Sequence, residues 1–213
     1  MKLANMILTA AAIVAVTGVS AFGKEKAKEG TGSNRQVTVY FCGNNVVDPA
    51  MEGWSRVLTS DMFSRIGVTV HWRMGIPSRP EAGAIVVEVV TGTPAAFKPG
   101  ALAYALPYEG VHIRIFGDRI NAYSNRREVL AHVMAHEITH ILQGEARHSS
   151  EGVMKAFWST GDLALMARMP LSFAQEDVDL IYLGMDKRAA QATGSSVSAT
   201  LATTAAAVGI AEK

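Results

Sequence analysis

Residues 125–148 read NRREVLAHVMAHEITHILQGEARH and predict one long helix. Asn125 is a favoured N-cap residue, and Glu128 follows three positions later, which is a capping-box pattern. Apolar side chains then recur every three or four residues as far as Leu142, the spacing of one buried helical face. Gly144 suits the left-handed turn that ends a helix. We therefore expect a helix between Asn125 and Gly144 whose apolar face packs on a core.

The helix carries the motif His136-Glu-Ile-Thr-His140. The two histidines lie about one turn apart on one face, so both imidazoles can bind a single metal ion. Glu137 lies beside them, where its carboxylate can act as general base on a water held by the metal. The motif predicts one catalytic Zn²⁺ ion, with two solvated histidines as the alternative without metal.

A catalytic zinc needs a third protein ligand and an open fourth position. His148 lies eight residues after His140, and Gly144 between them can turn the chain back. Imidazole is the most favoured ligand type here, which makes His148 the preferred third ligand. The rivals are carboxylates of the following segment: Glu145, Glu151 and Asp162.

Four other residues of reactive types are interpreted as structural. His132 lies one turn before His136, where we expect it to hydrogen-bond a neighbour, because a third ligand from the same helix cannot easily complete a tetrahedron. His71 and His112 lie in expected strands, and Cys42 at a strand end is interpreted as a small buried apolar side chain.

Hydrophobic patterning on either side of the helix predicts an α/β (α+β) fold. Alternating or continuous apolar runs predict strands, and helical spacing predicts an early helix and two late ones. The strands are expected at 36–42, 68–72, 84–90, 101–106 and 111–116, and these helices at 49–66, 162–169 and 175–183.

The run from His136 to His148, followed by Gly152-Val-Met154, resembles the metzincin metallopeptidases, most of all the matrixin-like and archaemetzincin-like ones. The resemblance implies a five-stranded mixed, twisted sheet with an antiparallel edge strand, two long helices and a small C-terminal helical subdomain. It implies that His136, His140 and His148 bind one zinc ion, with Glu137 as the base and Met154 in a tight turn beneath the metal.

The resemblance extends to about residues 36–185, and it includes small exported bacterial proteins of this type. Residues 101–107 look like the edge strand that aligns an extended substrate, which implies substrate contacts by Leu102, Ala103, Tyr104 and Ala105. Phe157 and Trp158 follow the methionine turn, where the family builds the wall of a substrate pocket. Residues 171–184 resemble the C-terminal helix of matrixin catalytic domains.

Two departures from the family pattern concern the site itself. The family has two residues on each side of the glycine in His-Glu-x-x-His-x-x-Gly-x-x-His, whereas this chain has three between His140 and Gly144 and three between Gly144 and His148. The segment after Met154 also lacks the tyrosine that is an extra zinc ligand in some metzincins.

The chain ends differ in composition from this central part. Residues 1–21 combine Lys2, an apolar run and small residues before a cut after Ala21, which is typical of a secretory signal peptide; an uncleaved membrane anchor is the alternative. Residues 22–35 are expected to form a flexible linker, 36–188 the metzincin-like domain, and 189–213 a disordered Ala/Thr/Ser-rich tail. We therefore expect a secreted or periplasmic protein without stable membrane insertion after cleavage.

The charge balance argues against nucleic-acid partners. The 213-residue chain has a formal net charge of +1 and one cysteine, which leaves no basic surface for phosphate binding and no internal disulfide. The hypothesis that follows is an exported zinc-dependent endopeptidase with a peptide or protein substrate. The alternative is a non-catalytic exported binding module, in which zinc is structural or absent.

Overall fold

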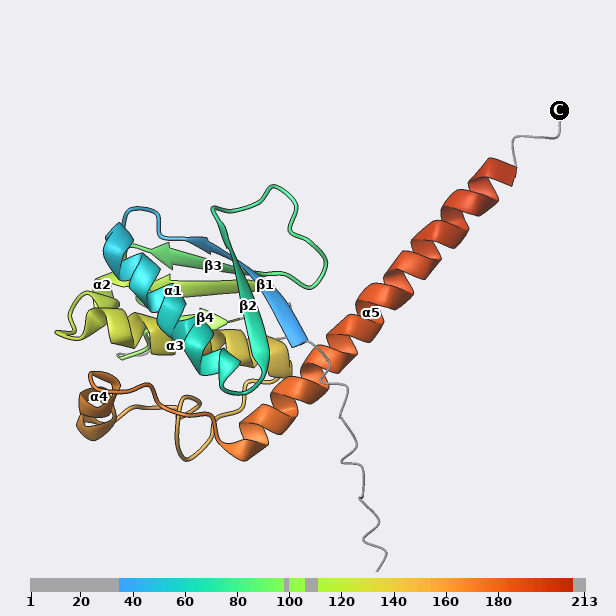
Figure 1. Ribbon diagram of the computed structural model, residues 1–213. Helices are drawn as coiled ribbons and strands as arrows, with labels where there is room; N and C mark the ends of the chain where they lie inside the picture. The colour runs from blue at the N-terminus through green and yellow to red at the C-terminus, as the bar shows by residue number, and fades with distance from the viewer. Residues whose placement is uncertain (1–34, 98–99, 106–110, 209–213) are drawn as a thin grey trace, which may run out of the picture. The chain divides into compact units, whose positions relative to one another are not determined.

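The computed structural model describes residues 35–97, 100–105 and 111–208, and the side chains of 193–208 are outside this description. Two expected segments lie outside the described residues: the signal peptide at 1–21, and the linker at 22–35 except for its last residue. The described strands form one sheet in the order β2-β1-β3-β5-β4 (Figure 1). Their bounds are β1 Arg35–Cys42, β2 Val68–Met74, β3 Ile85–Val90, β4 Ala103–Ala105 and β5 His112–Phe116.

Four of the strands are parallel and one is antiparallel. β1 pairs in parallel with β2 and β3, β3 pairs in parallel with β5, and β4 pairs antiparallel with β5. In β1 the buried residues alternate as Val37, Val39 and Phe41, which places every second side chain in the core. The mixed five-stranded sheet with an antiparallel edge strand confirms the expected fold class.

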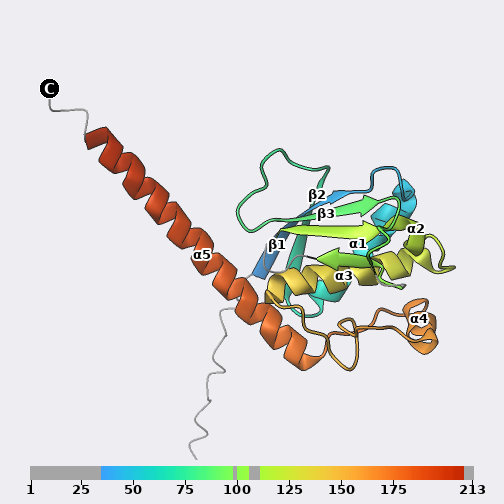
Figure 2. The ribbon, with the colours of Figure 1, turned by 180° about the vertical axis from the view of Figure 1, so that it is seen from behind.

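The helices are α1 Pro49–Ser64, α2 Gly117–Ile120, α3 Arg126–Gln143, α4 Thr160–Met166 and α5 Gln175–Val208. α1 packs on β2, and α3 packs on β3, β4 and β5. Two buried hydroxyls join these helices, because Ser55 Oγ donates to the carbonyl of Arg127 and Thr59 Oγ1 to that of Ala131. α1 and α3 therefore lie side by side on one face of the sheet, as Figure 2 shows from behind.

The two ends of α3 differ in how closely they follow the sequence pattern. Gly144 has φ 72° and ends the helix in the expected left-handed turn. The capping box expected of Asn125 and Glu128 does not form. The Asn125 side chain donates instead to the carbonyl of Leu163, and Glu128 pairs with Arg127. Asn125 has φ −98° and ψ 43° rather than extended backbone, so its side chain is directed away from the first turn.

The last helix is longer than the sequence pattern predicts. α5 continues through residues 189–208, where a disordered tail is expected, and alanine has the highest helix propensity of all residues. At Gly184 the helix crosses the end of α3 so closely that a Cβ there would lie 1.8 Å from the carbonyl oxygen of Leu142. None of the helices in the described ranges has the length and apolarity that crossing a bilayer requires.

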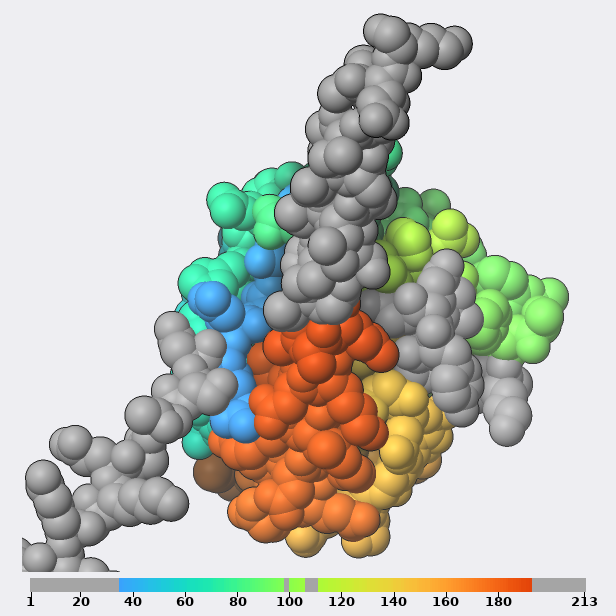
Figure 3. Space-filling model, turned by 90° about the vertical axis from the view of Figure 1, so that its right-hand side faces the viewer, coloured from blue at the N-terminus to red at the C-terminus, as the bar shows by residue number. Residues whose placement is uncertain are grey.

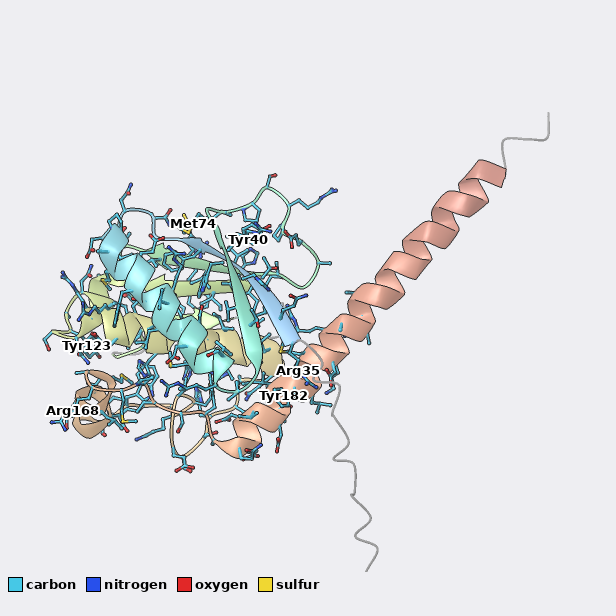
Figure 4. The ribbon with its side chains drawn as sticks, viewed as in Figure 1. Arg35, Tyr40, Met74, Tyr123, Arg168 and Tyr182 are labelled. Carbon is cyan, nitrogen blue, oxygen red and sulfur yellow. The ribbon has the colours of Figure 1, made fainter. Side chains whose placement is uncertain are left out.

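The first turns of α5 also hold the start of the sheet. Figure 3 shows these turns, in orange, against β1, in blue, and against the end of α3, in yellow. The guanidinium of Arg35 lies 4.2 Å from the ring centre of Tyr182 and bonds to Asp186 (Figure 4). This contact joins the N-terminal end of the described chain to α5.

Candidate metal centre

α3 directs two imidazoles at one point. The Nε2 atoms of His136 and His140 lie 3.1 Å apart. Their Nδ1 atoms face backbone carbonyls, His136 that of Val153 at 2.9 Å and His140 that of Glu145 at 3.0 Å. A carbonyl oxygen only accepts hydrogen bonds, so both Nδ1 atoms carry the proton and both Nε2 atoms keep a free lone pair. This is the tautomer that binds a metal ion through Nε2.

His148 comes from the loop after Gly144 and completes the cluster. Its ring stacks on that of His136 with centres 5.2 Å apart, and it lies edge-on to His140 at 5.0 Å. One ring nitrogen from each histidine lies within 4.8 Å of the other two. Zinc–nitrogen bonds of about 2.0–2.1 Å place tetrahedral ligand nitrogens about 3.3 Å apart, so the donor set fits a zinc ion after small adjustments.

The structure brings together the three histidines that the sequence singles out. Glu145 and Glu151 are exposed and do not join the cluster, which is the one group of this kind in the described part of the chain. Asp162 instead accepts from Lys155 Nζ at 2.5 Å and from Ser159, with which it forms a capping box at the start of α4.

Burial favours the neutral form of each imidazole. It lowers the pKa of His136 to about 3, with His140 adding a smaller effect of the same sign. It also lowers the pKa values of His140 and His148 below the usual 6.5. All three rings are therefore neutral at pH 7, which is the state in which imidazole binds metal.

Glu137 is buried beside the histidines. Burial raises its pKa to about 8, while a hydrogen bond from the backbone amide of Ala105 acts in the opposite direction. A divalent cation held by the neighbouring imidazoles favours the carboxylate, because opposite charges at short range lower an acid's pKa. The hydrogen bond also joins the motif glutamate to the edge strand β4.

A cavity of about 210 Å³ opens next to the cluster. His136, Glu137 and His148 line one part of it. Its other walls are the segment leading into β4, the segment after the methionine turn, Tyr123 just before α3, and side chains of α3 and α4. These lining residues are Gly100, Ala101, Leu102, Ala103, Tyr123, Val133, Lys155, Ala156, Phe157, Trp158 and Leu163.

The expected edge-strand residues do not all face the cavity. Leu102 and Ala103 line the cavity, and Ala105 contacts Glu137 through its amide. Tyr104 does not line the cavity and stacks on Phe97, with ring centres 4.9 Å apart. Side chains alternate along a strand, which explains why Tyr104 faces away from Ala103 and Ala105 within β4, whereas Leu102 lies in the segment before the strand.

The expected pocket-wall residues both line this cavity. Phe157 is 78% exposed. The ring of Trp158 lies edge-on to that of His136, with ring centres 5.7 Å apart. Met154 is fully buried, and its carbonyl accepts the backbone amide of Ser149 at 2.8 Å. The methionine turn therefore contacts the loop that carries His148.

The residues interpreted as structural have protein partners in the described chain. His132 is fully buried; its Nδ1 lies 2.6 Å from the carbonyl of Glu128, and its Nε2 accepts from the amide of Leu171. His71 bonds to Gln36, and Cys42, which is half-buried, to Asn44. His112 lies exposed on β5, away from the cluster.

Sequence reasoning did not single out several residues that line the cavity, among them Val133, Tyr123 and Leu163. Val133 belongs to the buried stripe of α3, and its place one turn before Glu137 is the signal that could have found it. Tyr123 lies at the N-terminal end of α3 (Figure 4), and Leu163 lies on α4. Their place at the cavity depends on tertiary packing, which no local pattern encodes.

Comparison with known proteins supports the fold. No family model matches the sequence, and no curated protein does. Among 64 matching solved chains is an archaemetzincin from Methanopyrus kandleri, with a TM-score of 0.51 and 14% sequence identity. The match covers 71% of this chain and 96% of that one. The chain thus has an α/β fold similar to that of an archaemetzincin, with a cluster of three histidines, two on its long helix and one in the loop that follows.

Proposed function

We propose that this protein is a zinc-dependent endopeptidase. The observation that carries the proposal is the convergence of three imidazole nitrogens beside Glu137 at the edge of a cavity. His136, His140 and His148 would hold one zinc ion, and two of them line the cavity. The archaemetzincin-like fold supports this proposal, although it is a likeness of fold alone.

The chain's own groups account for binding and proton transfer. A zinc ion bound there would supply Lewis acidity to a peptide carbonyl and to a water molecule. Glu137 takes the proton of the attacking water on its carboxylate and passes it to the leaving amine. β4 lies at the end of the sheet and would bind the substrate backbone by strand addition, while the cavity takes a side chain.

We also propose that the protein is exported to the periplasm or secreted. The support is the signal-peptide pattern at residues 1–21. A peptide or protein outside the cytoplasm is then the substrate.

The test compares Glu137→Gln with wild type in the full chain. Glutamine keeps the shape of the side chain but cannot take a proton, so we expect peptide-library cleavage to fall about 10²–10⁴-fold. Zinc content should stay near one ion per chain, since Glu137 is not a ligand. Glu151→Gln is the matched control, because Glu151 is exposed and outside the cluster.

Two results would overturn the proposal. One is equal cleavage by wild type and Glu137→Gln. The other is a zinc-loaded wild type that cleaves no peptide of a broad library, which would support the alternative of a non-catalytic binding module.

A further inference from the structure

A single buried carboxylate holds the chain on both sides of His148. Asp177 lies in the first turn of α5 and is 0% exposed. Its Oδ1 accepts from Arg147 Nη1 at 2.7 Å and from Ser149 Oγ at 2.6 Å. These two donors are the residues immediately before and after His148. The loop that carries the third histidine is therefore fixed to α5 at both neighbours of that histidine.

This loop needs such a support more than the helix does. The rings of His136 and His140 are oriented by backbone carbonyls and stand on a buried helix. His148 is exposed, and within the described residues only stacking and edge contacts with the other two rings hold its imidazole. Fixing a flexible residue costs backbone entropy, and a tethered loop has already lost that entropy before it binds a metal ion.

The arrangement is poorly explained as a contribution to stability alone. Asp177 Oδ2 is buried with no hydrogen-bond partner in the described structure, although Arg147 faces the other oxygen. A buried ion pair gains little net stability, because the cost of removing both charges from water offsets their attraction. What the pair does provide is a fixed position for Arg147 and Ser149.

We propose that Asp177 is a positioning residue that places His148 for metal binding. This inference rests on the proposed function only in requiring that the three histidines bind a metal. The loop has one residue more on each side of Gly144 than the metzincin pattern, and the tether to α5 compensates for that extra length. Asp177 itself does not reach the metal, since it is outside the ligand cluster.

The experiment measures metal binding rather than cleavage. Asp177→Asn keeps the shape but removes the charge that holds Arg147 and Ser149, so zinc affinity should fall about 10–100-fold in competition with a chromophoric chelator. The visible absorption of the Co²⁺-loaded variant should change as well, because it reports the geometry of the ligands. Glu176→Gln is the matched control: Glu176 pairs with Arg147 too, but its side chain is 69% exposed, and we expect wild-type affinity.

A double variant separates positioning from general destabilisation. If Asp177 acts through His148, adding Asp177→Asn to His148→Ala should lower zinc affinity little further. A merely structural role predicts the same fold-loss in both backgrounds. Wild-type affinity and an unchanged Co²⁺ spectrum in a folded Asp177→Asn protein would overturn the inference.

A further variant covers the case in which Asp177→Asn does not fold. Ser149→Ala removes one donor without leaving a buried charge unpaired, and we expect a several-fold loss of zinc affinity; no loss would overturn the inference. If wild type binds no zinc, the inference and the proposed function both fail. If it binds zinc but cleaves nothing, the proposed function fails and the affinities still decide the role of Asp177.

Discussion

Nδ1 of His136 lies 2.9 Å from the carbonyl oxygen of Val153, a residue 17 positions further along the chain. The amide of Val153 in turn donates to the carbonyl of Ser172 at 3.0 Å. Gly152, just before it, has φ 72°, and a Cβ there would lie 2.2 Å from that same carbonyl oxygen. The ring of a helix residue is thus oriented by a turn that only glycine allows.

Replacing the candidate ligands should show which residue is the third one. We expect His148→Ala to lower zinc affinity at least about 100-fold, because the cluster loses one of three nitrogen donors. Glu145→Ala and Glu151→Ala should bind zinc as wild type does. Chelator competition measures all three affinities. Retained affinity in His148→Ala, with a loss in either glutamate variant, would assign the third ligand to a carboxylate.

Narrowing the cavity should change which peptides are cleaved. Leu163 lines the cavity on α4, so Leu163→Trp leaves less room for a substrate side chain. We expect the preference at the residue after the scissile bond to shift about 10-fold or more toward small side chains, with zinc content unchanged. Leu165→Trp is the control, since Leu165 is 41% exposed on the same helix and does not line the cavity. If Leu163→Trp cleaves the peptide library with the same preference as wild type, the specificity pocket lies elsewhere.

His132 should make the metal-free protein less stable in acid. Burial lowers its pKa below the usual 6.5, an effect only partly offset by the carbonyl and charge of Glu128. At a pH between the pKa values of His132 in the folded and the unfolded chain, the unfolded chain binds more protons. The free energy of unfolding should therefore fall as the pH drops below about 6.5, by at most about 1.4 kcal/mol per pH unit for this one group.

Denaturant unfolding of wild type and His132→Gln, both with a metal chelator, measures this effect. Glutamine can still accept from the amide of Leu171 but does not titrate. The stability advantage of wild type should be largest above pH 6.5 and should shrink toward pH 5. An advantage that is the same at both pH values would contradict the assignment of His132 as a buried neutral residue.

The sequence predicts the fold well where an element has its own hydrophobic pattern. The bounds expected for the long helix, between Asn125 and Gly144, agree with α3. The expected strand at 101–106 is shorter, Ala103–Ala105, with residue 106 outside the described ranges. The short helix α2 is absent from the expected elements, because four residues are too few to show a helical period.

The site is only partly encoded in local sequence. The spacing of His136 and His140 places both on one face of a helix whatever surrounds them. The position of His148 depends on Asp177, about 30 positions away in the chain, through the bond to Arg147. Spacing alone therefore left His148 and the nearby carboxylates as rivals, and only the folded loop distinguishes them.

Gly184 gives a different view of where this protein tolerates change. It carries no reactive group, yet any side chain there would collide with the carbonyl of Leu142, two residues before the turn at Gly144. Moving α5 away would shift Asp177 and the loop it holds. In a saturation mutagenesis scan, substitutions at position 184 should be tolerated as poorly as substitutions of the three cluster histidines. A survey of essential residues would therefore include a position whose residue has no reactive side chain.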